Sequence, residues 1–237
     1  NLQLIMNRFI FIIVFIFSIN ISSDEVNDPF ENLNRKTFEF NENLDQKILK
    51  PTAKFYSKFP PRIKKGITNF FNNLEEVDTS VNQLLQGKPK KSANDFTRFV
   101  INSTVGLGGF IDVATKIGLE RHEEDFGQTL AVWGVGEGPY IMLPGLGPST
   151  LRDTFSRPVS SFLSVTFHMT ETDVNIALKS IDAIETRERL LEVESLLSGD
   201  KYSFVKDAYI QSIQYEVKDG INVQDDFVDD MDDFLID

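Results

Sequence analysis

The sequence predicts a mainly α-helical protein, built as a single domain of short amphipathic helices. Apolar residues recur at helical spacing in several segments, and proline or glycine interrupts each segment before it becomes long. No run of alternating polar and apolar residues predicts a β-strand. With 237 residues, of which 41% are hydrophobic, the chain is long enough to bury a core of ordinary size.

The first element is an apolar N-terminal segment. The short basic stretch Met6–Arg8 precedes the unbroken apolar run Phe9–Phe17. This run is shorter than the roughly 20 residues that a membrane-spanning helix needs. We therefore interpret residues 1–23 as a signal peptide and expect export to the periplasm; a retained apolar anchor is the alternative.

The helical domain is expected to occupy residues 24–219. Asp28 and Pro29 predict the start of a first helix, whose apolar stripe continues to Leu49. Pro51 predicts the start of a second, short helix, which the pair Pro60-Pro61 ends. The next apolar stripe, Ile67–Leu85, predicts a longer helix that stops before Gly87 and Pro89.

The second of these helices is basic and amphipathic. Lys50, Lys54 and Lys58 recur every four residues, with Phe55 and Phe59 between them. Such a segment is typical of helices that lie along an anionic bilayer surface. A solvated lysine face above packed aromatic side chains explains the same pattern. Both readings stay open, and the five residues are candidate membrane-surface residues.

Five shorter helices are expected in the middle of the chain. Ser92 predicts the cap of one helix, and a second is expected over about Ile111–Ile117. Asp125 is expected to cap a short helix over Phe126–Val132, although its carboxylate could instead face a polar path. Downstream, Pro148 or Ser149 and then Pro158 predict two more helix starts.

Two helical patterns follow before an acidic end. Thr172 opens the longest pattern, which runs to Leu197, and a final helix is expected over about Asp200–Tyr215. Residues 220–237 are strongly acidic and are expected to be disordered. The formal net charge of −12 argues against nucleic acid as a partner, because phosphate binding requires a basic face.

The region from Gly106 to Pro148 differs from the rest. Ten of the 14 glycines and three of the nine prolines lie in it, threaded with apolar residues. Apolar residues among so many breakers cannot form one long helix. They predict a tightly folded apolar loop that lies against a lipid-like environment or is enclosed by neighbouring helices.

Three blocks in this region make the sequence recognisable. They are Glu124-Asp-Phe-Gly-Gln-Thr-Leu130, Trp133-Gly-Val-Gly-Glu-Gly-Pro-Tyr140 and the segment Leu143–Asp153. Together with Asp28–Arg35 and Ile101–Ala114, they closely resemble the MlaA (VacJ) family, over roughly residues 28–165. The resemblance implies a ring of helices around an amphipathic channel, in the inner leaflet of a bacterial outer membrane and on its periplasmic side.

The resemblance also implies a function. Proteins of this family remove mislocalised phospholipid from the outer leaflet and pass it to a soluble periplasmic carrier, and trimeric porins hold the ring in place. Family members normally carry a lipidated cysteine after the signal peptide, whereas this sequence has no cysteine. A soluble periplasmic lipid-binding protein and a periplasmic scaffold stay open as alternatives.

The glycine-rich region supplies the candidate lipid path. Its backbone turns and exposed peptide groups could line a polar route for a headgroup, because a headgroup is costly to move through hydrocarbon without polar partners. The predicted path residues are Gly106, Gly108, Gly109, Trp133, Gly134, Gly136, Tyr140, Leu143, Gly145, Leu146 and Gly147. For Trp133 and Tyr140, ordinary core packing is the competing interpretation.

No set of residues predicts catalysis. The glycines at 106, 108 and 109 lack the spacing of a nucleotide-binding loop, and Ser149 does not lie in a nucleophile elbow. His122 and His168 are the only histidines, and His122 is expected to be an exposed member of a charged loop. Arg152 and Asp153 are expected to pair with each other. We therefore predict no catalytic residue, no metal site, no cofactor and no enzymatic activity.

Overall fold

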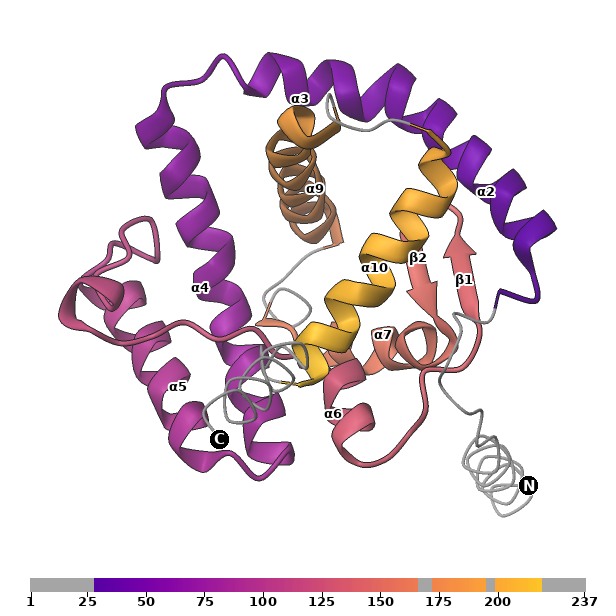
Figure 1. The fold of residues 1–237 in the computed structure, drawn as a ribbon. Coiled ribbons are helices and arrows are strands. Elements are labelled where there is room, and N and C mark those ends of the chain that lie inside the picture. Colours follow the sequence, from indigo (N-terminus) through magenta and orange to yellow (C-terminus); the bar gives the residue numbers. More distant parts are fainter. Residues whose placement is uncertain (1–27, 166–171, 195–198, 219–237) are drawn as a thin grey trace, which may run out of the picture.

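The computed structural model describes residues 28–165, 172–194 and 199–218. The predicted signal segment and acidic tail lie outside these residues. Within them, helices follow one another around a ring (Figure 1). The predicted mainly helical architecture is confirmed.

The first side of the ring is one nearly continuous rod at the top of Figure 1. It comprises α2 (Glu31–Leu44), the π-helical turn η1 (Asp45–Leu49) and α3 (Lys50–Tyr56). Pro51 lies in the first turn of α3, as predicted, but the π turn joins α3 to α2 without a break. The wider π turn directly before Pro51 makes room for the pyrrolidine ring of this proline, which would otherwise clash with a carbonyl of the preceding turn.

Helices α4 (Pro61–Leu85) and α5 (Pro89–Thr104) form an antiparallel hairpin with a polar interface. Ser80 Oγ donates to the Ser92 carbonyl at 2.9 Å, and Ser92 Oγ donates to the Ser80 carbonyl at 2.7 Å. Ser92 was predicted to cap α5, but Pro89 begins that helix and Ser92 lies inside it. Deeper in the interface, Arg98 Nε lies 2.7 Å from Glu76 Oε1, and both side chains are 1% exposed.

A long loop connects α5 to α6 (Phe126–Val132). The helix expected over Ile111–Ile117 is only a 3-10 turn, η2 (Thr115–Ile117). The predicted cap of α6 is confirmed: Asp125 Oδ1 accepts a hydrogen bond from the backbone N–H of Gln128 at 2.8 Å.

A small antiparallel hairpin follows, which the sequence did not predict. Strand β1 (Tyr140–Leu143) pairs with β2 (Gly147–Thr150), and Tyr140 lies opposite Thr150. Strands of four residues are too short for alternation to stand out. Helix α7 (Leu151–Leu163) begins directly after β2, so Pro148 and Ser149 do not start a helix. Pro158 lies inside α7 rather than at the start of another helix.

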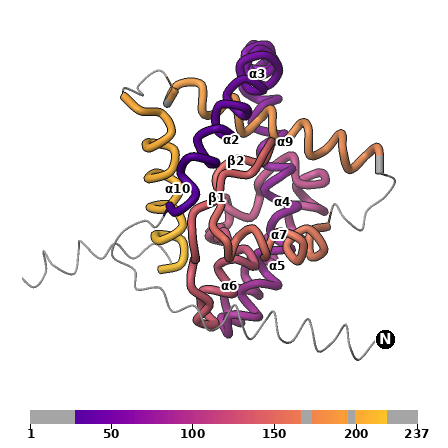
Figure 2. The backbone as a smooth tube through the Cα atoms, turned by 90° about the vertical axis from the view of Figure 1, so that its right-hand side faces the viewer, coloured from indigo at the N-terminus to yellow at the C-terminus, as the bar shows by residue number. Residues whose placement is uncertain are grey.

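The last two helices close the structure. Helix α9 (Thr172–Glu194) is held against the first side of the ring by ion pairs, among them Arg187 Nε–Asp45 Oδ1 at 2.6 Å. Helix α10 (Lys201–Val217) packs on the hairpin, where Tyr202 and Ile210 meet Tyr140 and Met142 in a small apolar core. Figure 2 shows α10 along one face of the molecule and α9 projecting toward the opposite face.

The distribution of side chains is inverted relative to an ordinary globular protein. Among the described residues, twenty polar or charged side chains are buried, against ten hydrophobic ones, while 28 large hydrophobic side chains are exposed. Water-soluble proteins bury their large apolar residues and leave charged ones outside. No helix of the described residues is long and apolar enough to cross a membrane. The fold therefore has a polar interior and an apolar exterior.

Gly106 is required where the loop after α5 folds back on that helix. A Cβ at this position would lie 2.2 Å from the Ile111 carbonyl oxygen and 2.4 Å from that of Asn102. We expect Gly106→Ala to lower the free energy of unfolding by about 2–3 kcal/mol, because backbone atoms must move to accept the methyl group. Thermal unfolding followed by circular dichroism measures the change.

The matched control is Gly108→Ala. Gly108 has open space around its α-carbon and a φ of +72°, so its replacement is expected to cost only about 1 kcal/mol of backbone strain. An equal or larger loss for Gly108→Ala would show that close approach at Gly106 is not what fixes this loop.

Candidate functional site

The candidate site is a cavity of about 530 Å³ between α6, α7, α9 and α10. Most of the residues that line it carry polar or charged groups, with both signs of charge. The side chains around it are Asp125, Gln128, Leu146, Arg152, Asp153, Ser156, Arg157, Ser160, Ser161, Lys179, Tyr209, Ser212, Ile213 and Glu216. Such a lining suits a polar or zwitterionic group better than an acyl chain.

Helix α7 supplies six of the fourteen lining residues, more than any other element, because its polar residues share one face. Asp153, Ser156, Arg157 and Ser160 follow one another at intervals of three, one and three residues, which places them on one side of a helix. Large apolar residues occupy the other side. Phe155, Val159 and Phe162 are 56%, 37% and 56% exposed. The helix therefore turns its polar face inward and its apolar face outward.

The start of α7 is fixed by a reciprocal cap. The backbone N–H of Asp153 donates to Thr150 Oγ1 at 3.1 Å, and Thr150 Oγ1 donates to Asp153 Oδ2 at 2.7 Å. The same carboxylate accepts a hydrogen bond from Tyr209 Oη at 2.9 Å, which ties α10 to α7. Arg152 Nε donates to Asp153 Oδ1 at 3.1 Å, so the predicted local pairing of these two residues is confirmed. Asp153 is thus the residue that joins both walls of the cavity.

Several cavity-lining groups lack a partner. Arg152 Nη2, Arg157 Nε, Ser160 Oγ and Gln128 Oε1 are buried and form no hydrogen bond within the structure. An unsatisfied buried donor costs about 1–3 kcal/mol, and more when it is charged. Two guanidinium groups and a hydroxyl group can therefore donate to a negatively charged ligand in the cavity, or to water.

The pKa values of two acidic groups at the cavity, Asp125 and Glu216, are shifted toward the neutral form. Burial raises the pKa of Asp125, and the charge of Asp153 raises it further. Burial likewise raises the pKa of Glu216. Behind Asp125, the pKa of Asp78 is raised to about 7, mainly by burial and then by the charge of Asp125. Protonation of these groups would leave the arginines as the dominant charges of the site.

Most of the predicted path residues lie outside this cavity. Among them, Leu146 alone lines it. Gly106, Gly108 and Gly109 belong to the loop between α5 and η2, where Gly109 lies directly against Asn73 of α4. The role of these glycines in lipid passage stays a prediction, and their close packing is an independent reason for the absence of a side chain.

The remaining path residues surround the β hairpin and the turn before it. Tyr140 is 1% exposed in the small apolar core, whereas Trp133 is half exposed and donates through Nε1 to the Leu85 carbonyl at 3.1 Å. Leu143 is half-buried and its carbonyl accepts a hydrogen bond from Asn41. Gly136 is exposed. Three others, Gly134, Gly145 and Gly147, adopt φ values of +90°, +72° and +82°, which favour glycine whatever their function.

The candidate membrane-surface residues are placed as follows. Lys54, Phe55, Lys58 and Phe59 are exposed, and the two phenylalanine rings contact each other edge to face. Lys50 differs because its Nζ lies 2.7 Å from Glu194 Oε1 and its side chain is half-buried. A role at a membrane surface stays a prediction for these residues.

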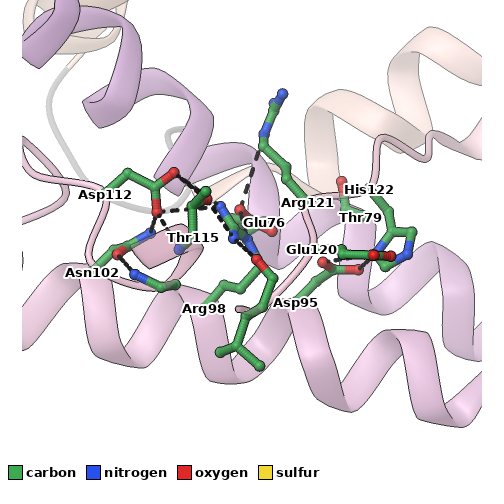
Figure 3. Close-up of polar contacts among 12 residues, drawn as sticks. Glu76, Thr79, Asp95, Arg98, Asn102, Asp112, Thr115, Glu120, Arg121 and His122 are labelled. Atoms are coloured by element: carbon green, nitrogen blue, oxygen red, sulfur yellow. Dashed lines mark hydrogen bonds and ion pairs between the residues drawn. The ribbon is translucent and has the colours of Figure 1, made fainter. Parts of the chain in front are cut away.

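A second charged cluster lies between α4, α5 and the loop that follows α5 (Figure 3). It centres on the Arg98–Glu76 pair and includes His122, whose Nδ1 lies 3.0 Å from Asp95 Oδ2. The expectation that His122 is an exposed loop residue was wrong, since it is largely covered and paired. Among the described residues, no group of three or more His, Cys, Asp or Glu side chains is arranged to hold a metal ion.

The sequence reasoning missed most of the cavity. Arg152, Asp153 and Asp125 were singled out, but Ser156, Arg157 and the α10 residues were not. The polar stripe of α7 is the sequence signal for these residues. Its residues have the helical spacing that apolar residues have on the core-facing side of an ordinary helix, but they are polar. A search for polar rather than apolar stripes would have placed this helix correctly.

The comparisons with known proteins agree with this geometry. A family model described as "MlaA lipoprotein" matches residues 26–216. A relative from Escherichia coli (strain K12), named "Intermembrane phospholipid transport system lipoprotein MlaA", is 40% identical over 200 residues, which cover 81% of this chain and 79% of the relative. A relative of the same name from Haemophilus influenzae is 35% identical, with 83% of this chain and 81% of the relative covered.

The fold also matches a solved structure. A chain described under "Structural basis for maintenance of bacterial outer membrane lipid asymmetry" superposes with a TM-score of 0.72 at 38% identity. The superposition covers 81% of this chain and 99% of that chain.

The raised pKa of Asp78 predicts a pH-dependent stability. Because its folded-state value of about 7 exceeds the ordinary 3.8, the folded state holds a proton between about pH 4 and 7 that the unfolded state has released. Stability contributed by this group therefore falls as the pH rises through that window. We expect Asp78→Asn to raise the free energy of unfolding by roughly 1–3 kcal/mol at pH 7.5 and to change it little at pH 4.

Thermal unfolding of the variant and the parent across this pH range tests the expectation. Asp207→Asn removes the same charge from an exposed position of α10 and serves as the control. A stabilisation by Asp78→Asn that is as large at pH 4 as at pH 7.5 would contradict the assignment.

Proposed function

The chain belongs to the MlaA lipoprotein family, and we propose that it moves phospholipid between the outer and inner membranes and thereby maintains the lipid asymmetry of the outer membrane. One observation carries this proposal beyond the resemblance. The ring buries polar and charged side chains, four of which line the cavity, and exposes many large apolar side chains. That inversion suits a protein whose outside contacts acyl chains and whose inside conducts a polar group.

The proposed passage places the headgroup in the cavity. Arg152 Nη2, Arg157 Nε and Ser160 Oγ are the donors without partners, and they would bind the phosphate oxygens. Each new hydrogen bond offsets part of the cost of removing the headgroup from water. The barrier to crossing is thereby lowered without any bond being formed or broken. The absence of enzymatic activity stays a prediction.

The exterior indicates how the ring would sit in the membrane. No described helix can span a bilayer, so the molecule would lie within one leaflet. The exposed apolar side chains occur on most sides of the ring; the largest exposed fractions include Leu33, Phe55, Val105, Leu107, Ile117 and Leu146. Lys54 and Lys58, which flank Phe55 on α3 and the turn after it, would then lie at headgroup level on the periplasmic side.

The finer steps belong to the proposal as well. Removal of mislocalised phospholipid from the outer leaflet, transfer to a periplasmic carrier and contact with a trimeric porin follow from the family resemblance. A soluble lipid-binding protein is the main alternative, and it would need an apolar pocket for an acyl chain. The cavity is instead lined by arginines, carboxylates and serines, which disfavours that alternative.

Arg157→Gln tests the role of the cavity. Arg157 donates within the chain to the Pro148 carbonyl at 3.3 Å through Nη2, while its Nε is unpaired, so its loss should disturb folding little. We expect transport to slow roughly tenfold, because a charge-assisted hydrogen bond to phosphate is lost. The readout is the accessibility of cell-surface phospholipid to added phospholipase, in Escherichia coli that carries this protein in place of its own relative.

The control for this experiment is Arg189→Gln. Arg189 lies exposed on α9, where its pair with Glu185 spans 3.4 Å, and the variant loses the same charge outside the cavity. If the Arg157→Gln variant transports phospholipid normally and its unfolding temperature is unchanged, the cavity is not part of the transport path.

The apolar exterior makes a separate prediction. We expect the double variant Phe155→Ser, Phe162→Ser to lose affinity for membranes by roughly tenfold or more, since each ring contributes about 1.5–3 kcal/mol when it is buried in acyl chains. Vesicle flotation of the purified protein measures the change. The variant Ser203→Ala, Ser212→Ala, on α10, provides the matched control.

The behaviour of the unmodified protein without detergent distinguishes a membrane-embedded ring from a soluble lipid-binding protein. A ring with this exterior should aggregate when detergent is removed in the absence of lipid, as size-exclusion chromatography would show. A monodisperse monomer in plain buffer would favour the soluble lipid-binding protein.

A further inference from the structure

A second cavity, of about 510 Å³, lies on the outer rim of the ring. It is formed by the first turns of α4 and by the loop that follows α5. We call it the rim groove and define it by Arg62, Lys65, Phe110, Ile111 and Lys116. It shares no lining residue with the central cavity, so it is a separate site.

Three cations surround the rim groove. Among the described residues, Arg62, Lys65 and Lys116 form no ion pair, and all three are exposed. Their neighbour Lys64 behaves differently, because its Nζ pairs with Glu188 Oε1 of α9 at 2.6 Å. The basic residues at the start of α4 therefore differ in role: Lys64 holds α9 in place, whereas Arg62 and Lys65 are exposed.

The one acidic residue of the groove does not neutralise these cations. Asp112 Oδ2 accepts a hydrogen bond from Thr115 Oγ1 at 2.5 Å, and both carboxylate oxygens lie 3.4 Å from Arg98 Nη2 (Figure 3). Asn102 Nδ2 donates to the same group at 3.2 Å. Asp112 is thus held toward the interior of the protein by Arg98, which also pairs with Glu76. Three cations and one carboxylate leave the lining of the groove with a formal excess of two positive charges.

The groove is a formed feature rather than a chance gap between side chains. The Phe110 ring stacks on Phe70 with centroids 5.2 Å apart, and Asn69 Nδ2 donates to the Phe110 carbonyl at 3.1 Å. Gly66 lies directly beneath this ring, since a Cβ there would be in ordinary contact with Phe110 at 3.4 Å. These contacts fix the loop at a set distance from α4.

Exposed apolar side chains occur in and beside the groove: Phe110 lines it, and Ile63 and Ile117 directly follow Arg62 and Lys116 in the sequence. Ile63, Phe110 and Ile117 are 51%, 49% and 61% exposed. A site that joins unpaired cations to exposed apolar side chains is complementary to an anionic amphiphile. A net negative headgroup gains from all three cations, whereas a zwitterionic headgroup brings its own positive charge.

We infer that the rim groove binds the headgroup of an anionic phospholipid of the surrounding leaflet, with its acyl chains along Ile63, Phe110 and Ile117. This lipid is a resident partner that holds the ring at the correct depth, and it is not the lipid that passes through the central cavity. The inference rests on the proposed placement of the ring in a membrane.

The test uses the absence of cysteine from the sequence. A single Ile117→Cys substitution next to Lys116 carries a fluorophore, and the full chain is reconstituted in phosphatidylcholine vesicles. Phosphatidylglycerol or phosphatidylcholine with a nitroxide high on one acyl chain is then added as a short-range quencher. We expect half-maximal quenching at a phosphatidylglycerol fraction at least roughly fivefold lower than that of phosphatidylcholine, since each basic residue near an anionic lipid favours binding by about this factor.

Two triple variants carry the same loss of charge. Arg62→Gln, Lys65→Gln, Lys116→Gln should abolish the preference for phosphatidylglycerol. Lys36→Gln, Lys47→Gln, Lys90→Gln removes three exposed lysines elsewhere and should leave the preference intact. Equal quenching by both lipids in the parent, or a preference that survives in the groove variant, would overturn the inference.

Two further outcomes identify the source of a failure. If inorganic phosphate in the buffer abolishes the preference as completely as the groove variant does, the groove binds free phosphate and the lipid assignment is wrong. If neither lipid quenches the fluorophore, the ring does not contact acyl chains there, and the proposed membrane placement fails together with the inference.

Discussion

The structure depends on the pairing of polar groups in its interior. A buried charge without a partner costs several kcal/mol, so a ring that buries its polar side chains is stable only if they satisfy one another. Among the described residues, buried polar groups pair with one another at three places in the fold. Ser80 and Ser92 join α4 to α5, Arg98 and Glu76 lie side by side in the same interface, and Asp153 connects the start of α7 to α10. The helices are positioned by these contacts rather than by a large apolar core.

The same constraint explains the exterior. Because polar side chains occupy much of the interior, many large apolar side chains face outward, and α7 has one face of each kind. In water this arrangement would expose a large apolar surface at high cost. In a leaflet the same surface is solvated by acyl chains. The groups left unpaired at the central cavity, above all on Arg152 and Arg157, are then the ones available to a passing headgroup.

The sequence predicted the kind of fold and the family, but it predicted little of the cavity. Asp125 was correctly expected to cap α6, because a cap is a local feature that three residues define. The helix starts predicted at Ser92 and Pro158 were wrong. Serine and proline also occur inside helices, and here α5 already begins at Pro89 and α7 at Leu151. Ser156, Arg157 and Tyr209 were missed because they meet through tertiary packing, and because a polar stripe is ordinarily taken for a solvated face. The glycines that dominated the sequence serve backbone turns and close contacts, at positions mostly outside the cavity.

Water access to α7 in a bilayer tests the central claim most directly. The chain has no cysteine, so Ser160→Cys on the inward face and Phe162→Cys on the outward face can each be exposed to a water-soluble, membrane-impermeant maleimide in proteoliposomes. We expect the maleimide to modify the cysteine at 160 and lipid to protect the cysteine at 162. Protection at 160 together with rapid modification at 162 would contradict a polar interior inside an apolar shell.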